Sequence, residues 1–224
     1  MSKEFGCMQD ENRYLDHIRR QISKTPVLID VGMNEGRFTQ EFLSRYPYAS
    51  VYGFEPIKEL CKVSTGKFLD KLYDKVYIYN VAIGKDFSSC ETFYVPNKGM
   101  ECSSFYVRPQ FPGNPTTTQV VPLDFYEHIF PPDIDYLKID VEGFEFDVLV
   151  GAKELIRSNR IKYIQFEVGD TLPLTGLKFC DIMKLLEDHY KVYDPNMNVI
   201  DSNFKLGDIL VRNYLAERLI WKNI

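Results

Sequence analysis

Residues 27–36 read VLIDVGMNEG, and this stretch decides the fold. Its first half is a short apolar run that ends at Asp30, which is typical of a buried strand in a parallel sheet. The second half contains two glycines that allow a tight loop, and apolar residues at helical spacing follow over 38–43. A strand, a glycine loop and a helix in this order indicate the first unit of an open α/β sheet, which binds ligands at the carboxyl ends of its strands.

Outside this unit the chain keeps alternating between strand-like and helix-like patterns, which specifies parallel βαβ units. An amphipathic helix is expected before the first strand, and two short strands are expected near the end of the chain. The expected strands lie over 50–55, 76–84, 136–140, 162–167, 190–194 and 207–213, and the expected helices over 8–22, 57–72, 123–129, 144–156 and 177–189. This pattern predicts a Rossmann-like α/β fold with a mostly parallel seven-stranded sheet, helices on both faces and an antiparallel terminal strand.

The length favours one domain with additions. At 224 residues the chain exceeds a typical domain of about 150 but is short for two, so we expect a single domain over 1–224. An N-terminal helix is expected within 1–25, and a terminal strand pair and tail over 190–224. The apolar tail residues pack either on the domain or on a second copy, so a monomer or a homodimer is expected. These residues are Leu215, Leu219, Ile220 and Trp221.

The segment 85–119 interrupts the alternation. It is dense in Ser, Thr, Pro and Gly and has only brief strand-like pieces. A connection of this length inside a compact domain is usually functional or mobile, and we interpret it as an insertion that covers the substrate. Its aromatic and proline-rich part, from Tyr94 to Phe111, would stack on an acceptor such as a sugar ring. A surface loop without a ligand is the alternative.

Composition and charge exclude several classes of function. The formal net charge is -5, so no general attraction to nucleic acid is expected. The five cysteines contain no C-x-x-C pair, which indicates neither a disulfide framework nor a zinc cluster. No stretch approaches the roughly 20 apolar residues that span a bilayer, and the N-terminus is too polar for a signal peptide. We therefore expect a cytoplasmic protein without a membrane span.

The loop over 32–36 selects the class of cofactor by its charge. A dinucleotide fingerprint needs G-x-G-x-x-G to admit a pyrophosphate, whereas this loop reads G-x-x-x-G from Gly32 to Gly36. Asp30 and Glu35 flank the loop and would repel a pyrophosphate. The same carboxylates favour S-adenosylmethionine, which carries a sulfonium and an ammonium group. We predict S-adenosylmethionine as the cofactor, and an NAD-linked oxidoreductase is the disfavoured alternative.

Glu55 ends the second strand, where an acidic side chain accepts hydrogen bonds from ribose hydroxyls. Its alternative role is that of an acidic residue near a helix start ahead of Pro56. Val81 and Ala82, at the third strand, would form an apolar wall beside the adenine, although ordinary strand core is an equally good interpretation of Val81. These four residues are predicted to bind the cofactor.

The fourth strand ends in KIDVEG (138–143), which places Lys138, Asp140 and Glu142 at the edge expected to face the cleft. Charges in such a position are costly unless they are paired or used. Glu167 should end the fifth strand and share this rim. Because a sugar hydroxyl is a poor nucleophile near neutral pH, these four residues are the predicted catalytic set, with the carboxylates as candidate bases.

Two alternatives to this base are weaker. A hard divalent ion held by the same carboxylates would also activate a hydroxyl, but metal-free base catalysis is favoured, and no metal ligand is predicted. His128 is a more familiar base, yet it follows a short apolar segment and precedes FPP, so a structural histidine is expected.

Several motifs in succession resemble the FkbM family of methyltransferases. They are DVGMNEG at 30–36, FEP at 54–56, NVAIG at 80–84, SS at 103–104, LKIDVEGFEFDVLVGA at 137–152 and FE at 166–167. The resemblance covers about 26–168 and implies a class I methyltransferase fold and O-methylation, often of sugar or polyketide hydroxyls. Met33 departs from the family, which usually has alanine there, and should reshape the methionine end of the cofactor pocket.

The resemblance also implies that Ser104 and Asn34 lie around the cofactor and that Glu142 belongs to a DVEG signature, although a hairpin turn is the alternative role of Ser104. The full expected cofactor-binding set is Asp30, Gly32, Asn34, Gly36, Glu55, Pro56, Val81, Ala82, Ser104 and Asp140.

These observations predict an S-adenosylmethionine-dependent O-methyltransferase that acts on a hydroxyl, most often of a sugar in a glycan or glycoconjugate. A non-sugar acceptor, such as a polyketide, lipid or phenol, is the first alternative, and a non-catalytic S-adenosylmethionine-binding module is the second. A glycan-building enzyme such as a glycosyltransferase, fused or separate, would be a fitting partner.

Overall fold

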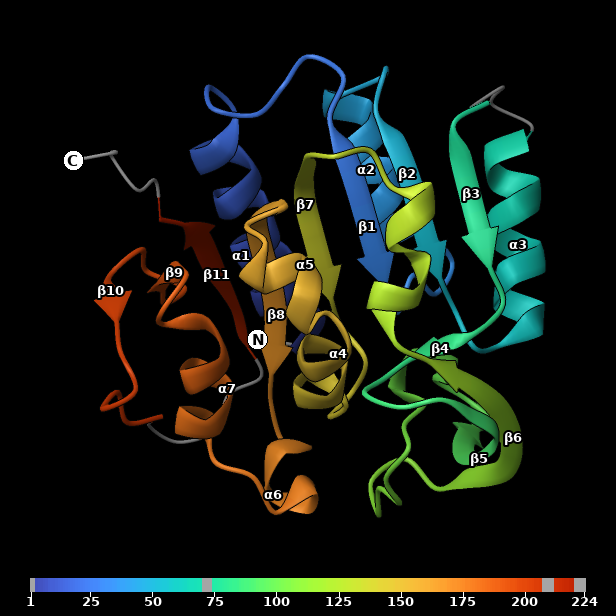
Figure 1. Cartoon of the computed structure of the whole chain (residues 1–224). Coiled ribbons are helices and arrows are strands. Elements are labelled where there is room, and N and C mark those ends of the chain that lie inside the picture. The colour runs from blue at the N-terminus through green and yellow to red at the C-terminus, as the bar shows by residue number, and fades with distance from the viewer. Residues whose placement is uncertain (1–2, 70–73, 207–211, 220–224) are drawn as a thin grey trace.

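The computed structural model describes residues 3–69, 74–206 and 212–219. Its main element is an eight-stranded sheet in the order β10-β9-β11-β8-β7-β1-β2-β3 (Figure 1). The five strands from β8 to β3 are parallel, as the alternation predicts, and β11 is antiparallel to both of its neighbours. The strands are β1 Val27–Val31, β2 Ser50–Phe54, β3 Val76–Tyr79, β7 Ile134–Ile139, β8 Ile161–Val168, β9 Tyr190–Tyr193, β10 Val199–Ile200 and β11 Arg212–Arg218. The prediction of seven strands misses β10, because a two-residue strand is too short to leave a pattern.

Helices cover both faces of this sheet (Figure 1). Side chains of successive strand residues point to opposite faces, so Leu28 packs with α1 and α2, whereas Ile29 packs with α4, α5 and α7. The helices are α1 Lys3–Ile18, α2 Arg37–Arg45, α3 Lys58–Leu69, α4 Glu145–Gly151, α5 Lys153–Arg157, α6 Leu172–Thr175 and α7 Phe179–Leu186, with 3-10 turns η1 Met100–Cys102 and η2 Leu123–Ile129. None of the helices in the described ranges has both the length and the apolar character that a bilayer crossing requires.

The strand predicted over 76–84 is two strands in different sheets. β3 ends at Tyr79, and after a bend β4 Ala82–Ile83 joins a second, three-stranded sheet. The side-chain amide of Asn80 donates to the backbone oxygens of Glu55 and Pro56 and so fixes the bend. The apolar pattern runs through both strands, and for this reason the sequence does not reveal the break.

The segment 85–119 is more regular than predicted. It contains β5 Ser88–Pro96 and most of β6 Gly113–Val121, which pair antiparallel, and β6 also pairs parallel with β4. The expectation of only brief strand-like pieces is therefore wrong. Figure 1 places this small sheet at the carboxyl ends of β1, β2 and β7. The insertion thus lies where an open α/β sheet binds its ligands.

The end of the chain also differs from the expectation. The last strand was expected over 207–213, of which 207–211 lie outside the described residues, and β11 continues to Arg218 between β8 and β9. Leu215 is accordingly a buried core residue of the domain, whereas Leu219 is partly exposed. Ile220 and Trp221 lie outside the described residues.

Candidate functional site

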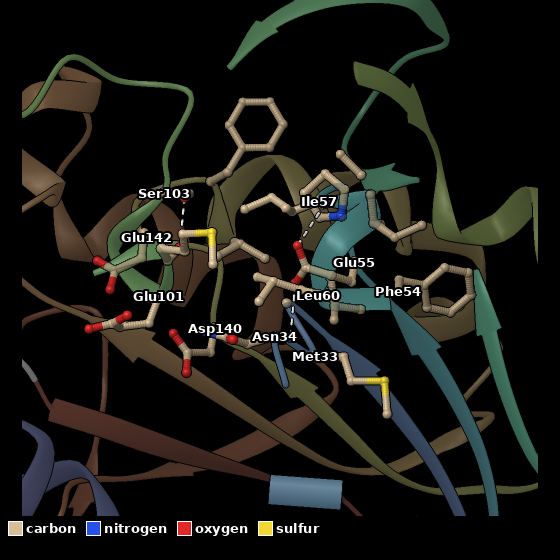
Figure 2. A pocket seen from close by; sticks show the side chains of 18 of the residues that line it. Met33, Asn34, Phe54, Glu55, Ile57, Leu60, Glu101, Ser103, Asp140 and Glu142 are labelled. Carbon is tan, nitrogen blue, oxygen red and sulfur yellow. Dashed lines mark hydrogen bonds between the residues drawn. The ribbon is translucent and has the colours of Figure 1, made fainter. Parts of the chain in front are cut away.

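A cavity of about 710 Å³ lies at the carboxyl ends of the central strands, beneath the insertion. Figure 2 shows Glu55 on one side of it and Asp140 and Glu142 on the other. Of the predicted site residues, those on the cavity wall are Gly32, Asn34, Glu55, Pro56, Val81, Ala82, Lys138, Asp140, Glu142 and Glu167. Chain segments more than one hundred residues apart therefore meet at one site.

Three predicted cofactor residues are absent from the cavity wall: Asp30, Gly36 and Ser104. Asp30 is fully buried, accepts a hydrogen bond of 2.7 Å from the Thr39 hydroxyl and has its other oxygen 3.5 Å from Lys138 Nζ. A contact between Asp30 and the cofactor stays a prediction, and in this structure Asp30 is not on the cavity wall. Its carboxylate supports the buried lysine beneath the cavity.

The loop after β1 packs very closely against the end of β7. Gly32 has φ 75°, and a Cβ at this position would lie 1.9 Å from the backbone oxygen of Asp140. A side chain is therefore excluded at Gly32 both by backbone conformation and by space. Gly36 also has a positive φ, 74°, and a Cβ there would meet the Phe68 ring, so its role is in packing.

Met33 borders the cavity, but its side chain is buried and packs beneath β2. A Cβ added to Gly53 would lie 2.2 Å from the Met33 sulfur. In Figure 2 the Met33 side chain points away from Glu55 and Asp140. The bulk of Met33 is therefore accommodated by the missing side chain of Gly53.

Glu55 is held rigidly at the tip of β2. Its two carboxylate oxygens accept hydrogen bonds of 2.8 Å from the backbone N–H groups of Asn34 and Ile57 (Figure 2). Burial raises the pKa of Glu55 to about 7, against the opposing effect of these two donors. Each oxygen keeps a second lone pair, so the carboxylate suits a pair of ligand hydroxyls.

Lys138 supplies buried positive charge at the end of β7. Its ammonium lies 3.2 Å from Asp140 and 3.5 Å from Asp30, and it donates to the backbone oxygen of Gly32. These neighbouring carboxylates raise the lysine pKa although burial opposes the shift. Lys138 therefore stays a cation, which suits charge stabilisation and excludes it as a base.

Glu142 is fixed from several directions. Its backbone adopts φ 54°, an uncommon conformation for a residue with a side chain. Ser104 donates a 2.7 Å hydrogen bond to its backbone oxygen, and Arg108 Nη1 lies 2.6 Å from its carboxylate. Glu145, at the start of α4, accepts hydrogen bonds from the backbone N–H groups of Val141 and Gly143, the two neighbours of Glu142. Burial raises the pKa of Glu145 to about 7. Ser104 thus supports the site through Glu142.

Sequence reasoning missed Arg108 and Glu145. Arg108 is 2% exposed and also pairs with Asp170 at 3.1 Å, so one guanidinium ties the insertion to the loops that follow β7 and β8. A lone arginine in a proline-rich segment gives no signal of this, because both partners lie far along the chain. Glu145 had a signal, an acidic residue in the first turn of a predicted helix, directly after the charged strand end.

The three candidate bases meet in space. Asp140, Glu142 and Glu167 each offer a carboxylate oxygen, and these oxygens all lie within 4.8 Å of one another. Such a group can accept a proton or hold a divalent ion. Buried cations lie against this group, with Lys138 3.2 Å from Asp140 and Arg108 2.6 Å from Glu142.

The charge on the cavity wall is mostly negative. Among the residues that the structure describes, two cations line it, Arg37 and Lys138. The carboxylates that line it are Glu35, Glu55, Glu101, Asp140, Glu142 and Glu167. An excess of carboxylates favours a ligand that carries positive charge and disfavours a pyrophosphate.

The insertion contributes an aromatic wall. Phe93, Phe105 and Phe111 line the cavity, and the ring of Phe105 lies 4.3 Å from that of Phe144. Tyr94 is not on the wall. His128 is also absent from the wall; it is exposed on η2, with Nδ1 3.0 Å from the backbone oxygen of Phe125, which agrees with a structural histidine.

Comparison with known proteins identifies relatives of this chain. A family model described as the methyltransferase FkbM domain matches residues 30–193. The 2-O-methyltransferase NoeI of Sinorhizobium fredii is 27% identical over 160 residues, a match that covers 63% of this chain and 63% of that protein. The chain thus spans less than two thirds of the length of that relative.

Solved structures agree on the fold. A methyltransferase FkbM from Methylobacillus flagellatus KT superposes with a TM-score of 0.52 at 15% identity, over 88% of this chain and 44% of that chain. A putative rRNA-methylase from Clostridium thermocellum gives 0.55 at 14% identity, over 93% and 95%. Since the family model spans well over half of the sequence, the chain belongs to the FkbM methyltransferase family, which implies S-adenosylmethionine as the methyl donor.

Proposed function

We propose that this chain transfers the methyl group of S-adenosylmethionine to a hydroxyl oxygen, and that the acceptor is a sugar in a glycan or glycoconjugate. The observation that carries the proposal is the division of one cavity between Glu55 on one side and the cluster of Asp140, Glu142 and Glu167 on the other. The first side offers acceptors for ribose hydroxyls, and the second offers a base for the acceptor hydroxyl.

The residues present fit S-adenosylmethionine in size and charge. A volume of about 710 Å³ is within the usual range of ligand pockets, roughly 300–1,000 Å³. Val81 and Ala82 would contact the adenine and Glu55 the ribose, while the excess of carboxylates suits the cationic groups. When bound, the donor supplies a methyl group already activated by its positive sulfur. The main task of the protein is then to align the acceptor oxygen with that methyl group.

We propose Glu167 as the base that accepts the hydroxyl proton as the new O–C bond forms. Asp140 and Glu142 each contact a buried cation, which their negative charges help to neutralise, so both carboxylates also have a structural role. Glu167 is buried on β8 within 4.8 Å of both. In this scheme Asp140 and Glu142 keep their negative charge and orient the acceptor.

The aromatic wall supports a sugar acceptor, and a related protein supports oxygen as the methylated atom. Phe93, Phe105 and Phe111 offer flat apolar faces, on which the C–H faces of sugar rings stack well. NoeI, which is 27% identical to this chain, is named a 2-O-methyltransferase, and this supports oxygen as the methylated atom.

The test is methyl transfer from isotopically labelled S-adenosylmethionine to a panel of sugars, oligosaccharides, phenols and polyketides, with and without EDTA. We expect label in a sugar hydroxyl and no loss of turnover with the chelator. If only phenols or polyketides are labelled, the acceptor is not a sugar. If EDTA abolishes turnover and Mg²⁺ or Mn²⁺ restores it, the carboxylate cluster holds a metal ion. Binding of S-adenosylhomocysteine without turnover of any acceptor would indicate a non-catalytic module.

The Glu167→Gln variant tests the base. We expect turnover to fall about 100-fold, the usual scale of general base catalysis, while the affinity for S-adenosylhomocysteine changes less than about twofold. Glu187→Gln, at an exposed position after α7, is the control and should keep wild-type turnover. Unchanged turnover in Glu167→Gln would move the base to another carboxylate.

A further inference from the structure

Arg37 is the first residue of α2 and lines the cavity. Its Nη2 donates to both carboxylate oxygens of Glu11, at 3.0 and 2.8 Å. Glu11 belongs to α1 and is 4% exposed, so a buried carboxylate from the N-terminal helix holds this guanidinium in place. Burying a carboxylate is unfavourable unless it is paired, so the buried Glu11 requires Arg37 as its partner and fixes the position of the guanidinium.

The guanidinium keeps donors for a ligand. The Arg37 side chain is 54% exposed, and within the described residues its Nη1 and Nε make no hydrogen bond. Lys138, the other cation on the wall, is 5% exposed and already contacts Asp30 and Asp140. An anionic group that enters the cavity would therefore meet Arg37 rather than Lys138.

The cavity has two chemically different ends. Glu55 at the tip of β2 marks one end, and Asp140 at the tip of β7 belongs to the other. Phe38, which follows Arg37 on α2, has its ring centre 5.8 Å from Lys138 Nζ. That ammonium lies 3.2 Å from Asp140, which places the start of α2 at the Asp140 end. If the ribose binds Glu55, as in the proposed function, the amino-acid end of the donor points toward Arg37. That end carries one anionic group, the α-carboxylate.

We propose that Arg37, positioned by Glu11, binds the α-carboxylate of the methionyl group of the donor. The inference rests on the proposed function, because it requires S-adenosylmethionine in this cavity. A planar guanidinium recognises a carboxylate with charge-assisted hydrogen bonds, which a lysine reproduces poorly. The acidic wall then receives the ammonium and sulfonium groups, and Arg37 supplies the single positive contact that the donor needs.

Binding calorimetry with two ligands tests the inference. S-adenosylhomocysteine has the α-carboxylate, and 5′-methylthioadenosine lacks the amino-acid group. We expect Arg37→Gln to weaken S-adenosylhomocysteine binding roughly 10- to 100-fold, the scale of a charge-assisted hydrogen bond, and to change 5′-methylthioadenosine binding less than about twofold. An equal loss for both ligands, or no loss for either, would overturn the assignment.

Matched variants separate this contact from a structural effect. Arg45 also lies on α2 and pairs with Asp16 of α1 at 2.8 Å, but it is not on the cavity wall, so Arg45→Gln should leave both affinities unchanged. Glu11→Gln should weaken S-adenosylhomocysteine binding alone, and less than Arg37→Gln does. If the wild-type protein fails to bind S-adenosylhomocysteine, the proposed function itself fails. If it binds but Arg37→Gln shows no ligand-dependent loss, only the role of Arg37 fails.

Discussion

The proposed contact between Glu55 and the ribose predicts donor binding that depends on pH. Burial raises its pKa to about 7, so the neutral form is favoured in the folded protein below that pH. The stability contributed by this neutral form is complete below the ordinary pKa of about 4.3 and is lost as the pH rises through 7. Ribose hydroxyls donate better to the ionised carboxylate, so ligand binding has the opposite trend. We expect the affinity for S-adenosylhomocysteine to fall about tenfold between pH 8 and pH 6, measured by calorimetry.

The Glu55→Gln variant is the control for this pH dependence. It should bind S-adenosylhomocysteine more weakly at pH 8 and show a nearly flat profile. Glu145 also has a pKa raised to about 7 but does not line the cavity. A pH dependence that persists in Glu55→Gln would assign the titration to Glu145 or to another group.

Met33 and Gly53 form a complementary pair. Because a Cβ at Gly53 would lie 2.2 Å from the Met33 sulfur, Gly53→Ala should overpack this buried position and lower the free energy of unfolding by about 1–3 kcal/mol. Denaturant unfolding measures the loss. The double variant Met33→Ala/Gly53→Ala should recover part of it, since the shortened side chain leaves room. If the double variant loses as much free energy of unfolding as the two single variants together, this packing is contradicted.

At the residue scale, the sequence located charged residues better than it located their partners. A carboxylate at or just beyond the end of an apolar strand lies near the sheet edge, and for this reason Glu55, Asp140 and Glu167 are on the cavity wall. Asp30 is the fourth of the five residues of β1, yet its side chain is buried beneath the wall, where it contacts Lys138 and Thr39. Such pairing depends on contacts across the sheet, which residue spacing does not encode.

At the element scale, the insertion depends on Arg108. Arg108→Gln would leave the carboxylates of Glu142 and Asp170 without their buried cation, and the free energy of unfolding should fall by about 3 kcal/mol. The acceptor KM should rise, because the aromatic wall belongs to the insertion, while Glu55 on the main sheet keeps the S-adenosylhomocysteine affinity near wild type. Acceptor kinetics and calorimetry measure the two effects.

A partly exposed ion pair at the start of the insertion serves as the comparison. Lys85 is 55% exposed and lies 3.3 Å from Asp147, which is 10% exposed, so Lys85→Gln should cost less than Arg108→Gln, about 1 kcal/mol, and leave the acceptor KM unchanged. If the two variants behave alike, Arg108 does not anchor the insertion over the cavity.

The elements of the main sheet could be predicted, and those of the insertion could not. Buried parallel strands leave continuous apolar runs, as in β1 and β7, and the glycine loop marks the first crossover. β5 and β6 pair exposed residues, for example Thr92 with Thr117, and their polar composition resembles that of a loop. Antiparallel pairing across a loop of sixteen residues, 97–112, has no local signature.

At the scale of the whole molecule, strand order explains the place of the site. β1 pairs with β2, the next strand in the chain, on one side and with β7, more than one hundred residues later, on the other. From β1 the chain adds β2 and β3 on one side of the sheet, and it later returns to add β7 and β8 on the other side. This reversal of strand order is a switch point, which opens a crevice at the carboxyl ends of the strands. The alternating sequence predicts a parallel sheet with such a point. It does not predict that β11, the last strand, lies between β8 and β9.

The first helix and the last strand stabilise each other across this sheet. Asp10 of α1 is 1% exposed and forms two 2.8 Å hydrogen bonds with Arg212 of β11, and the Tyr14 hydroxyl donates to the backbone oxygen of Asn213. Asp10→Ala should lower the free energy of unfolding by about 2 kcal/mol, because hydrogen bonds to a buried charge are lost. For a domain of this size, the melting temperature should fall by about 4–8 °C.

Asp16→Ala on the same helix is the matched comparison. Asp16 is 69% exposed and pairs with Arg45, so its removal should lower the melting temperature by no more than about 2 °C. Equal losses in the two variants would mean that α1 is held by its surface charges and not by its contact with β11. A large loss in Asp10→Ala alone makes the docking of α1 on β11 part of the folded domain, and since Glu11 follows Asp10 directly, the same docking sets the position of Arg37.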